Sequence, residues 1–239
     1  MRRVSAALAV LLLLAAGAQA AQSLSWQEGE AWFPQEKDWT YHYMYRYPAA
    51  DGEGPLQEAL NYYFEQAQAE MMGLVIPMYA DDPIMTQGRQ NTITERYELT
   101  RNDDQFISFV LHHEQTIGEQ VQHSLRSVVF AAQGEYLGET LTLRGVAQVG
   151  ESSQQLAEAV LKDVWRQIQA RLDDQQEAWK PDLTYDTLKQ EFYPETHFYT
   201  DDEGRIVFYL QPGEFRRDQE VVTFSYLPGE IEALLEPTQ

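Results

Sequence analysis

Cysteine is absent from the 239 residues of this sequence. Its absence excludes disulfide bonds, thiol catalysis and metal sites that use thiolate ligands. The fold must therefore be held by its core alone, which is feasible because a chain of ~200 residues buries about 70% of its unfolded surface. A glycine-rich phosphate loop is absent as well, since the fourteen glycines are scattered singly. We expect no bound cofactor.

Basic residues are scarce, because 17 Lys and Arg stand against 38 Asp and Glu, for a net charge of −21. Such a chain lacks the basic footprint that nucleic acids require, and it is repelled by anionic lipid surfaces. The acidic excess favours cationic partners such as basic proteins. It is also what keeps an exported protein soluble, and both interpretations stay open.

Long hydrophobic runs are missing apart from one at the N-terminus. Arg2 and Arg3 precede the eleven-residue apolar run Ala6–Ala16, and Ala18–Ala20 provides a small-x-small cleavage pattern. The run is shorter than the ~20 residues that span a membrane. We therefore expect residues 1–20 to be a signal peptide that is cleaved after Ala20, which delivers the mature chain to the periplasm or the medium. An uncleaved anchor is the alternative.

Alternating aromatic residues predict the first strand of the mature chain. Four tyrosines fall on one side of a strand over residues 39–47, namely Tyr41, Tyr43, Tyr45 and Tyr47. Such a stripe is typical of the inner face of a sheet, although it also suits stacking on a sugar or a base. Pro48 is expected to end this strand because proline cannot donate to a sheet ladder. The polar residues 21–38 are expected to form a loosely held lead-in.

The remaining patterns predict helices and hairpins. A helix opens at Gly54-Pro55, and the longest helix begins with a capping box at Ser152 and Gln155 and runs to about residue 175. Residues 76–90 hold two prolines and are expected to form a loop. Further strands are expected at 92–100, 105–113, 125–132, 141–143, 197–200, 205–210 and 221–226, with a short helix at 228–235.

This irregular order of strands and helices does not fit a doubly wound parallel sheet. It predicts an α+β fold in which an antiparallel sheet carries two main helices packed on one face. The length of the mature chain fits either one large domain or two small ones.

No catalytic constellation stands out. His112 and His113 are adjacent, so a strand places them on opposite faces, and with His123 they are expected to make ordinary hydrogen bonds rather than a metal site. The acidic turns at 103–104 and 201–204 suit hairpins better than calcium. A Gly-x-Ser-x-Gly nucleophile elbow is missing. A wall-polysaccharide hydrolase that uses an Asp/Glu pair is the alternative function. Among 38 acidic residues, a catalytic pair cannot be recognised from the sequence.

Several short motifs resemble one known family. They are Tyr47-Pro48 after a tyrosine-rich strand, Asn61 on the next helix, Tyr97–Thr100 with Phe106–Ser108, Gly138–Leu143, and Phe198 with Asp202–Gly204 and Val207–Glu214. Together they resemble the extracytoplasmic module of RsiV-type anti-sigma factors and PdaC-type deacetylases. The PdaC-accessory-like half covers residues 39–148, and the RsiV-like half covers residues 149–239.

The resemblance implies an α+β module of the cell envelope that binds a ligand. RsiV-like proteins hold lysozyme through this module, so the implied partners are a cationic protein such as lysozyme or a peptidoglycan-derived ligand. The positions that match the family motifs and are expected to bind are His123, Glu214 and Phe215. The motif around residues 120–123 keeps only its histidine, and the deacetylase domain has no counterpart in this sequence.

Overall fold

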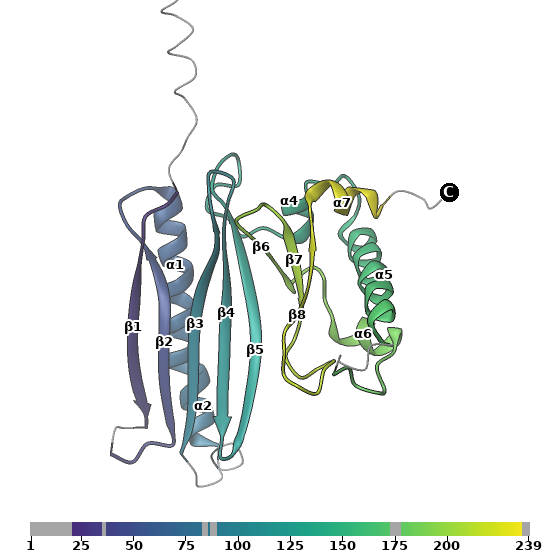
Figure 1. Cartoon of the computed structure of the whole chain (residues 1–239). Coiled ribbons are helices and arrows are strands. Elements are labelled where there is room, and N and C mark those ends of the chain that lie inside the picture. Colours follow the sequence, from purple (N-terminus) through teal and green to yellow (C-terminus); the bar gives the residue numbers. More distant parts are fainter. Residues whose placement is uncertain (1–20, 35–36, 83–85, 87–89, 173–177, 236–239) are drawn as a thin grey trace, which may run out of the picture.

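The computed structural model describes residues 21–34, 37–82, 86, 90–172 and 178–235. The expected signal peptide lies outside these residues. The chain forms a five-stranded sheet and a three-stranded sheet with helices against both (Figure 1), which confirms the predicted α+β class. Within the described ranges, none of the helices combines the length and the apolar character needed to cross a membrane.

The large sheet has the strand order β1-β2-β3-β4-β5. Its strands are β1 (Leu24–Phe33), β2 (Tyr41–Ala50), β3 (Asn91–Asn102), β4 (Phe106–Ile117) and β5 (Gln120–Ala131). All neighbours are antiparallel except β2 and β3, which run parallel. The parallel pair follows from the connection between them, because a parallel pair needs a long crossover and the helices of residues 55–81 provide one.

One face of the large sheet is covered by the crossover helices. Helix α1 (Pro55–Glu70) begins with proline at its first position and continues through a π-helical turn (Met71–Val75) into α2 (Ile76–Asp81). Its buried stripe packs on the apolar residues of β4 and β5, and the cluster contains Leu56, Leu60, Phe64, Ile107, Phe109, Val128 and Phe130. Each such fully buried side chain contributes about 1.5–3 kcal/mol.

The tyrosine stripe of β2 faces this covered side. Tyr41 and Tyr43 are fully buried and pack with Ile76 of α2 and Ile93 of β3. The interpretation of the stripe as the inner face of a sheet is therefore confirmed for these two tyrosines. Their rings take part in the core and are not available for stacking on a ligand.

Four predictions about local structure are wrong. The residues expected to be a lead-in contain β1, which was hidden because an edge strand with one neighbour tolerates polar side chains on its solvated side. Strand β2 continues past Pro48, since beyond Arg46 it pairs only with β1 and needs fewer amide donors.

Residues 76–81 form α2, because Pro77 suits a first helical turn. Leu141 and Thr142 form no strand and lead into helix α4 (Leu143–Ala147), and the only pairing near them in the described chain is a single bridge at Thr140.

The small sheet has the antiparallel order β6-β7-β8. Its strands are β6 (Phe198–Thr200), β7 (Ile206–Leu210) and β8 (Val222–Tyr226), and its helices are α5 (Ser153–Leu172), α6 (Tyr185–Glu191) and α7 (Pro228–Ala233). The predicted capping box of α5 is confirmed, because Gln155 N donates to Ser152 Oγ at 3.3 Å and Ser152 N donates to Gln155 Oε1 at 3.2 Å. The predicted end of α5 near residue 175 falls outside the described residues, and α6 was not predicted.

The small sheet lies between the large sheet and α5 (Figure 1). Phe208 and Phe224 pack with the stripe of α5, whereas Tyr209 packs with Val110 and Leu125 of the large sheet. Every residue of β7 is therefore buried. The predicted packing of the two main helices on one face of one antiparallel sheet is therefore wrong. Helices α1 and α5 cover different sheets, because each sheet has one apolar face that no strand of the other sheet covers, and the large sheet contains the parallel pair β2 and β3.

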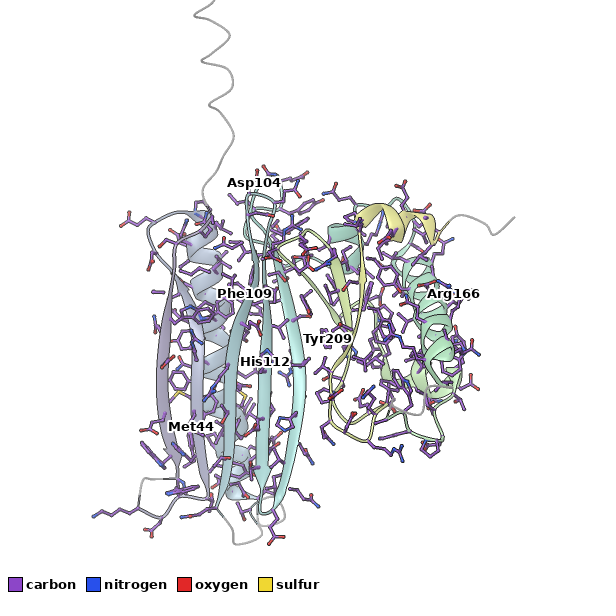
Figure 2. The ribbon with its side chains drawn as sticks, in the orientation of Figure 1. Met44, Asp104, Phe109, His112, Arg166 and Tyr209 are labelled. Carbon is purple, nitrogen blue, oxygen red and sulfur yellow. The ribbon has the colours of Figure 1, made fainter. Side chains whose placement is uncertain are left out.

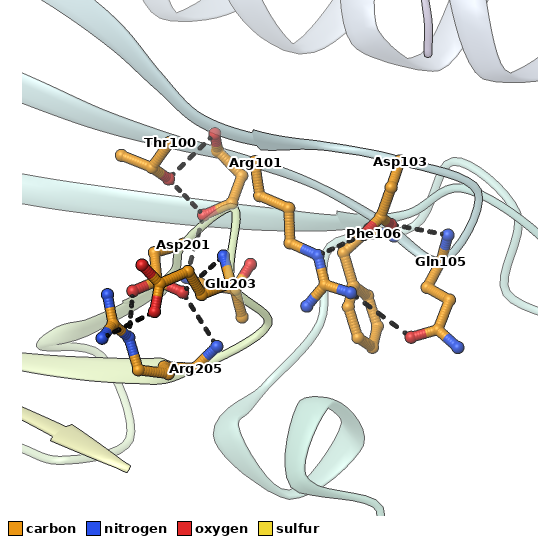
Figure 3. Close-up of polar contacts among 10 residues, drawn as sticks. Thr100, Arg101, Asp103, Gln105, Phe106, Asp201, Glu203 and Arg205 are labelled. Carbon is orange, nitrogen blue, oxygen red and sulfur yellow. Dashed lines mark hydrogen bonds and ion pairs between the residues drawn. The ribbon is translucent and has the colours of Figure 1, made fainter. Parts of the chain in front are cut away.

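The two predicted acidic turns are hairpin turns. Asp103 Oδ1 accepts from Gln105 N at 2.8 Å and from Phe106 N at 2.9 Å, and Asp201 Oδ1 accepts from Arg205 N at 2.9 Å (Figure 3). Burial alone would raise the pKa of Asp103, but the Phe106 amide and the Arg101 guanidinium together lower it. The aspartates thus close turns with their own backbone, which is the role expected for them.

Candidate ligand-binding groove

A groove of about 870 Å³ lies between the outer face of the large sheet and the segment that joins β7 to β8. Its floor is formed by β2 to β5, and its wall is formed by residues of the segment 211–221. The charged and polar side chains along it include Arg46, Thr94, Arg96, Glu98, His112, Glu114, His123 and Gln219, beside the indole of Trp26. It is a concave site with both signs of charge on a rigid floor.

The register of the sheet explains why these side chains meet. Residues paired across neighbouring strands point to the same face, about 4.8 Å apart. One row crosses the sheet from β1 to β5 and consists of Glu28, Arg46, Arg96, His112 and Leu125. The next row consists of Glu30, Met44, Thr94, Glu114 and His123. In Figure 2, His112 lies near the middle of the large sheet, and Met44 lies closer to its lower end.

Histidines in the groove lie beside glutamates of neighbouring strands. His112 Nε2 lies 2.9 Å from Glu98 Oε2, and His123 Nδ1 lies 3.5 Å from Glu114 Oε2. The bond to Glu98 orients the ring of His112, whereas His123 lies near Glu114 without a hydrogen bond to it. Both rings are partly exposed, at 52% and 41% of the side chain, and are therefore accessible to a ligand.

His113 points to the opposite face, as its adjacency to His112 predicted. Its Nδ1 lies 3.0 Å from Glu95 Oε1, and Tyr43 OH donates to Glu95 Oε2 at 2.8 Å. Burial, followed by the charge of Glu95, raises the pKa of Tyr43 far above its ordinary value. Among the residues that the structure describes, no three His, Asp or Glu side chains are grouped so as to hold a metal ion.

The two arginines of the groove have different surroundings. The guanidinium of Arg46 lies 3.2 Å from Glu28 Oε1 and 4.4 Å from the centre of the Trp26 ring. Arg96 is exposed, and its side chain makes no hydrogen bond or ion pair with any residue in the described part of the chain. One guanidinium is thus held in place, and the other is free to meet a ligand.

The three predicted binding residues do not gather at one site. His123 lies in the groove, whereas Glu214 and Phe215 line a separate hollow of about 400 Å³ with Lys180 and Glu191. Phe215 is 3% exposed and belongs to the core of the small sheet. Glu214 is exposed as a residue, yet partial burial of its carboxyl, followed by repulsion from Glu191, raises its pKa.

A carboxylate pair suited to glycoside hydrolysis would need a separation of about 5–10 Å. The two glutamates of the groove are Glu98 and Glu114, and the latter faces Thr94 across the sheet. At ~3.4 Å per residue, their Cα atoms are separated by roughly 14 Å. Each carboxylate also lies beside a different histidine, Glu98 beside His112 and Glu114 beside His123. This arrangement does not provide a converging acid and nucleophile.

Sequence reasoning missed Arg46 and Arg96. Both stand in an alternating strand pattern, so their exposure was readable. Their proximity was not, because it depends on the parallel pairing of β2 with β3 across a crossover of about 40 residues. Trp26 was noted as a possible docking point of the lead-in but was not placed in the groove, because the lead-in was not expected to contain strand β1.

No family model and no curated protein matches the sequence. Two solved structures are similar to it in fold. A member of the DUF3298 family from Bacteroides fragilis NCTC 9343 has a TM-score of 0.57 and 13% identity over 90% of this chain and 94% of its own. A DUF3298 family protein from Pseudomonas aeruginosa PAO1 has a TM-score of 0.56 and 11% identity over 93% of this chain and 100% of its own. The chain therefore shares the DUF3298 fold along most of its length.

Proposed function

We propose that this chain is an exported accessory module of the cell envelope that binds a ligand in the groove and does not transform it. The observation that carries the proposal is the groove floor, where Arg46, Arg96, His112 and His123 share one face of a rigid sheet. The fold of its structural neighbours supports it, since DUF3298 modules accompany RsiV-like and PdaC-type proteins. The signal-peptide pattern of residues 1–20 supports export.

The ligand class that suits the groove best is a soluble fragment of the cell wall. Such fragments present carboxylates, amides and hydroxyls together. The groove offers guanidinium and imidazole donors, glutamate acceptors and the indole of Trp26 within one cavity. His123 is the motif residue to which the proposal assigns ligand contact.

Isothermal titration of the exported protein with solubilised peptidoglycan fragments tests this proposal. We expect saturable binding that weakens at least tenfold when His123 is replaced by Ala. The matched control is Glu214→Gln, which alters the separate hollow and leaves binding unchanged. Saturable binding that Glu214→Gln abolishes and His123→Ala does not affect would place the site in that hollow instead.

A cationic protein such as lysozyme is the second candidate partner, and the net charge of −21 favours it. Exposed charges are screened within ~10 Å at 0.1 M salt. Binding of lysozyme should therefore be measurable at low salt and fall steeply as salt increases. Titrations that show no binding at either salt concentration would remove lysozyme from the candidates.

Location and the lack of turnover can be checked together. Edman sequencing of the protein recovered from the periplasm should begin at Ala21. Incubation of the purified protein with wall polymer should release no reducing sugar, because Glu98 and Glu114 do not converge. Release of sugar that is lost in Glu98→Gln or Glu114→Gln would establish the hydrolase alternative.

A further inference from the structure

We propose that Arg46 and Arg96 form a carboxylate-binding pair that receives the free C-terminal carboxylate of a short peptide. This inference rests on the proposed function of the groove and specifies the chemical group that the groove recognises. It is carried by the placement of the two guanidinium groups, by their unequal surroundings and by the charges around them.

The first observation is that the two arginines are register partners on adjacent strands. Like charges directly across a strand pair destabilise a sheet. The chain has only 17 basic residues against 38 acidic ones, so acidic neighbours for an arginine are plentiful. Two arginines side by side on the floor of the groove therefore oppose stability, and an anionic ligand relieves their repulsion.

The second observation is that the two arginine side chains have different contacts within the protein. Arg46 lies over the ring of Trp26 and beside the carboxylate of Glu28. Arg96 has no acidic partner within the described ranges, and it is exposed to the groove. Guanidinium groups bind carboxylates through paired N–H donors, and strands ~4.8 Å apart place two such groups within reach of one carboxylate. The guanidinium of Arg46 thus already contacts protein groups, and that of Arg96 is free to bind a ligand.

The third observation selects the carboxylate of a peptide over a phosphate. Glu98 and Glu114 lie on either side of the arginine row, on the same face. Their negative charges repel a dianion more strongly than a monoanion. They can accept hydrogen bonds from amide or ammonium N–H groups. A ligand with one carboxylate and adjacent N–H donors can therefore bind the arginines through its carboxylate and the glutamates through its N–H groups. The C-terminal end of a peptide has these groups.

The experiment titrates the exported protein with four probes: L-alanyl-L-alanine, its D,D form, the C-terminal amide of whichever form binds, and inorganic phosphate. We expect a dipeptide with a free carboxylate to bind and amidation to weaken its binding roughly tenfold or more. Arg96→Gln and Arg46→Gln should each cause a similar loss. Arg126→Gln is the matched control, because Arg126 is an exposed arginine of β5 on the opposite face of the same sheet.

Thermal unfolding of the same variants separates binding from structure. Removal of one like charge should leave the Tm of Arg96→Gln unchanged or raise it, although binding is lost. A Tm that falls by several degrees would show that Arg96 is structural and would overturn the inference.

The remaining outcomes distinguish the inference from the function on which it rests. Equal binding of the acid and the amide, or phosphate binding more tightly than the dipeptide, would overturn the carboxylate-binding pair. Wall fragments that still bind through His123 in that case would leave the proposed function standing. Failure of both the dipeptides and the wall fragments to bind would overturn the two together.

Discussion

The side-chain amide of Gln211 forms both of the hydrogen bonds that a neighbouring strand would make to the backbone of Leu125. Gln211 Nε2 donates to Leu125 O at 2.7 Å, and Leu125 N donates to Gln211 Oε1 at 2.8 Å. Gln211 follows β7 and opens the segment that forms the wall of the groove. One side chain thus covers part of the β5 edge and fixes the groove wall to its floor.

Replacement of Gln211 by Ala should therefore reduce the free energy of unfolding. Leu125 is 7% exposed, so its freed N–H and C=O lose partners where water replaces them poorly. The expected cost is about 1–3 kcal/mol, measured by urea unfolding. Gln154→Ala is the control, because Gln154 bonds to Glu158 on the exposed side of α5 and should change stability by less than ~0.5 kcal/mol. Equal costs for the two variants would show that the Gln211 amide is dispensable.

Phe64 of α1 is the centre of the core beneath the large sheet, where its ring meets those of Tyr97, Phe109 and Phe130. Phe64→Ala should cost about 3–5 kcal/mol, because it removes apolar contacts and leaves a cavity. Tyr62→Ala on the same helix is the control, since Tyr62 is 66% exposed. A loss of less than 1 kcal/mol for Phe64→Ala would contradict the packing of α1 on this sheet.

His197 should make stability depend on pH in the acidic range. Burial lowers its pKa below the ordinary value of 6.5, and its ring stacks on Tyr209 at 5.5 Å. Above pH 6.5 the imidazole is neutral in both states, whereas on acidification the unfolded chain takes up the proton first. Stability from this group is therefore fully present above pH 6.5 and is lost as the pH falls through the lowered pKa.

The variant His197→Phe keeps an aromatic ring against Tyr209 and removes the titration. Urea unfolding of both proteins between pH 7 and pH 5 should show a smaller loss of stability in the variant. Identical pH profiles would mean that His197 contributes nothing to the acid sensitivity of the fold.

Asp163 of α5 is a further source of acid sensitivity, at lower pH. Burial alone would raise its pKa, but bonds from Arg166, Gln167 and Tyr226 lower it overall. Its stabilising contribution is present above its ordinary value near 3.8 and is lost as the pH falls through the lowered pKa. Asp163→Asn should therefore flatten the stability profile below pH 4 while leaving the slope between pH 5 and pH 7 intact. A variant that changes only the latter slope would contradict this assignment.

Local patterns in the sequence were sufficient for much of the fold. The stripe of Leu56, Leu60 and Phe64 and the capping box of Ser152 each depend on residues a few positions apart, and both were predicted correctly. The edge strand β1 was missed because its polar sequence lacks the alternating pattern of a strand. It is stabilised by pairing with β2, which its own sequence does not reveal. A pattern of neighbouring residues holds no information about which distant segments pair.

The groove shows the same limit. His123 was singled out from a motif, whereas Arg46 and Arg96 were not, since nothing in the sequence joins residues 50 positions apart. Their proximity arises from the parallel register of β2 and β3. Glu214 was grouped with His123 by motif position, yet the two residues line different cavities.

The most direct test is a map of the ligand on the purified protein by amide and side-chain NMR during titration with solubilised wall fragments. We predict that shift changes concentrate on the groove floor and wall, at Arg46, Thr94, Arg96, His112, His123 and Gln219. Saturable changes confined to the hollow around Glu214 and Lys180, or no changes at millimolar fragment, would contradict it.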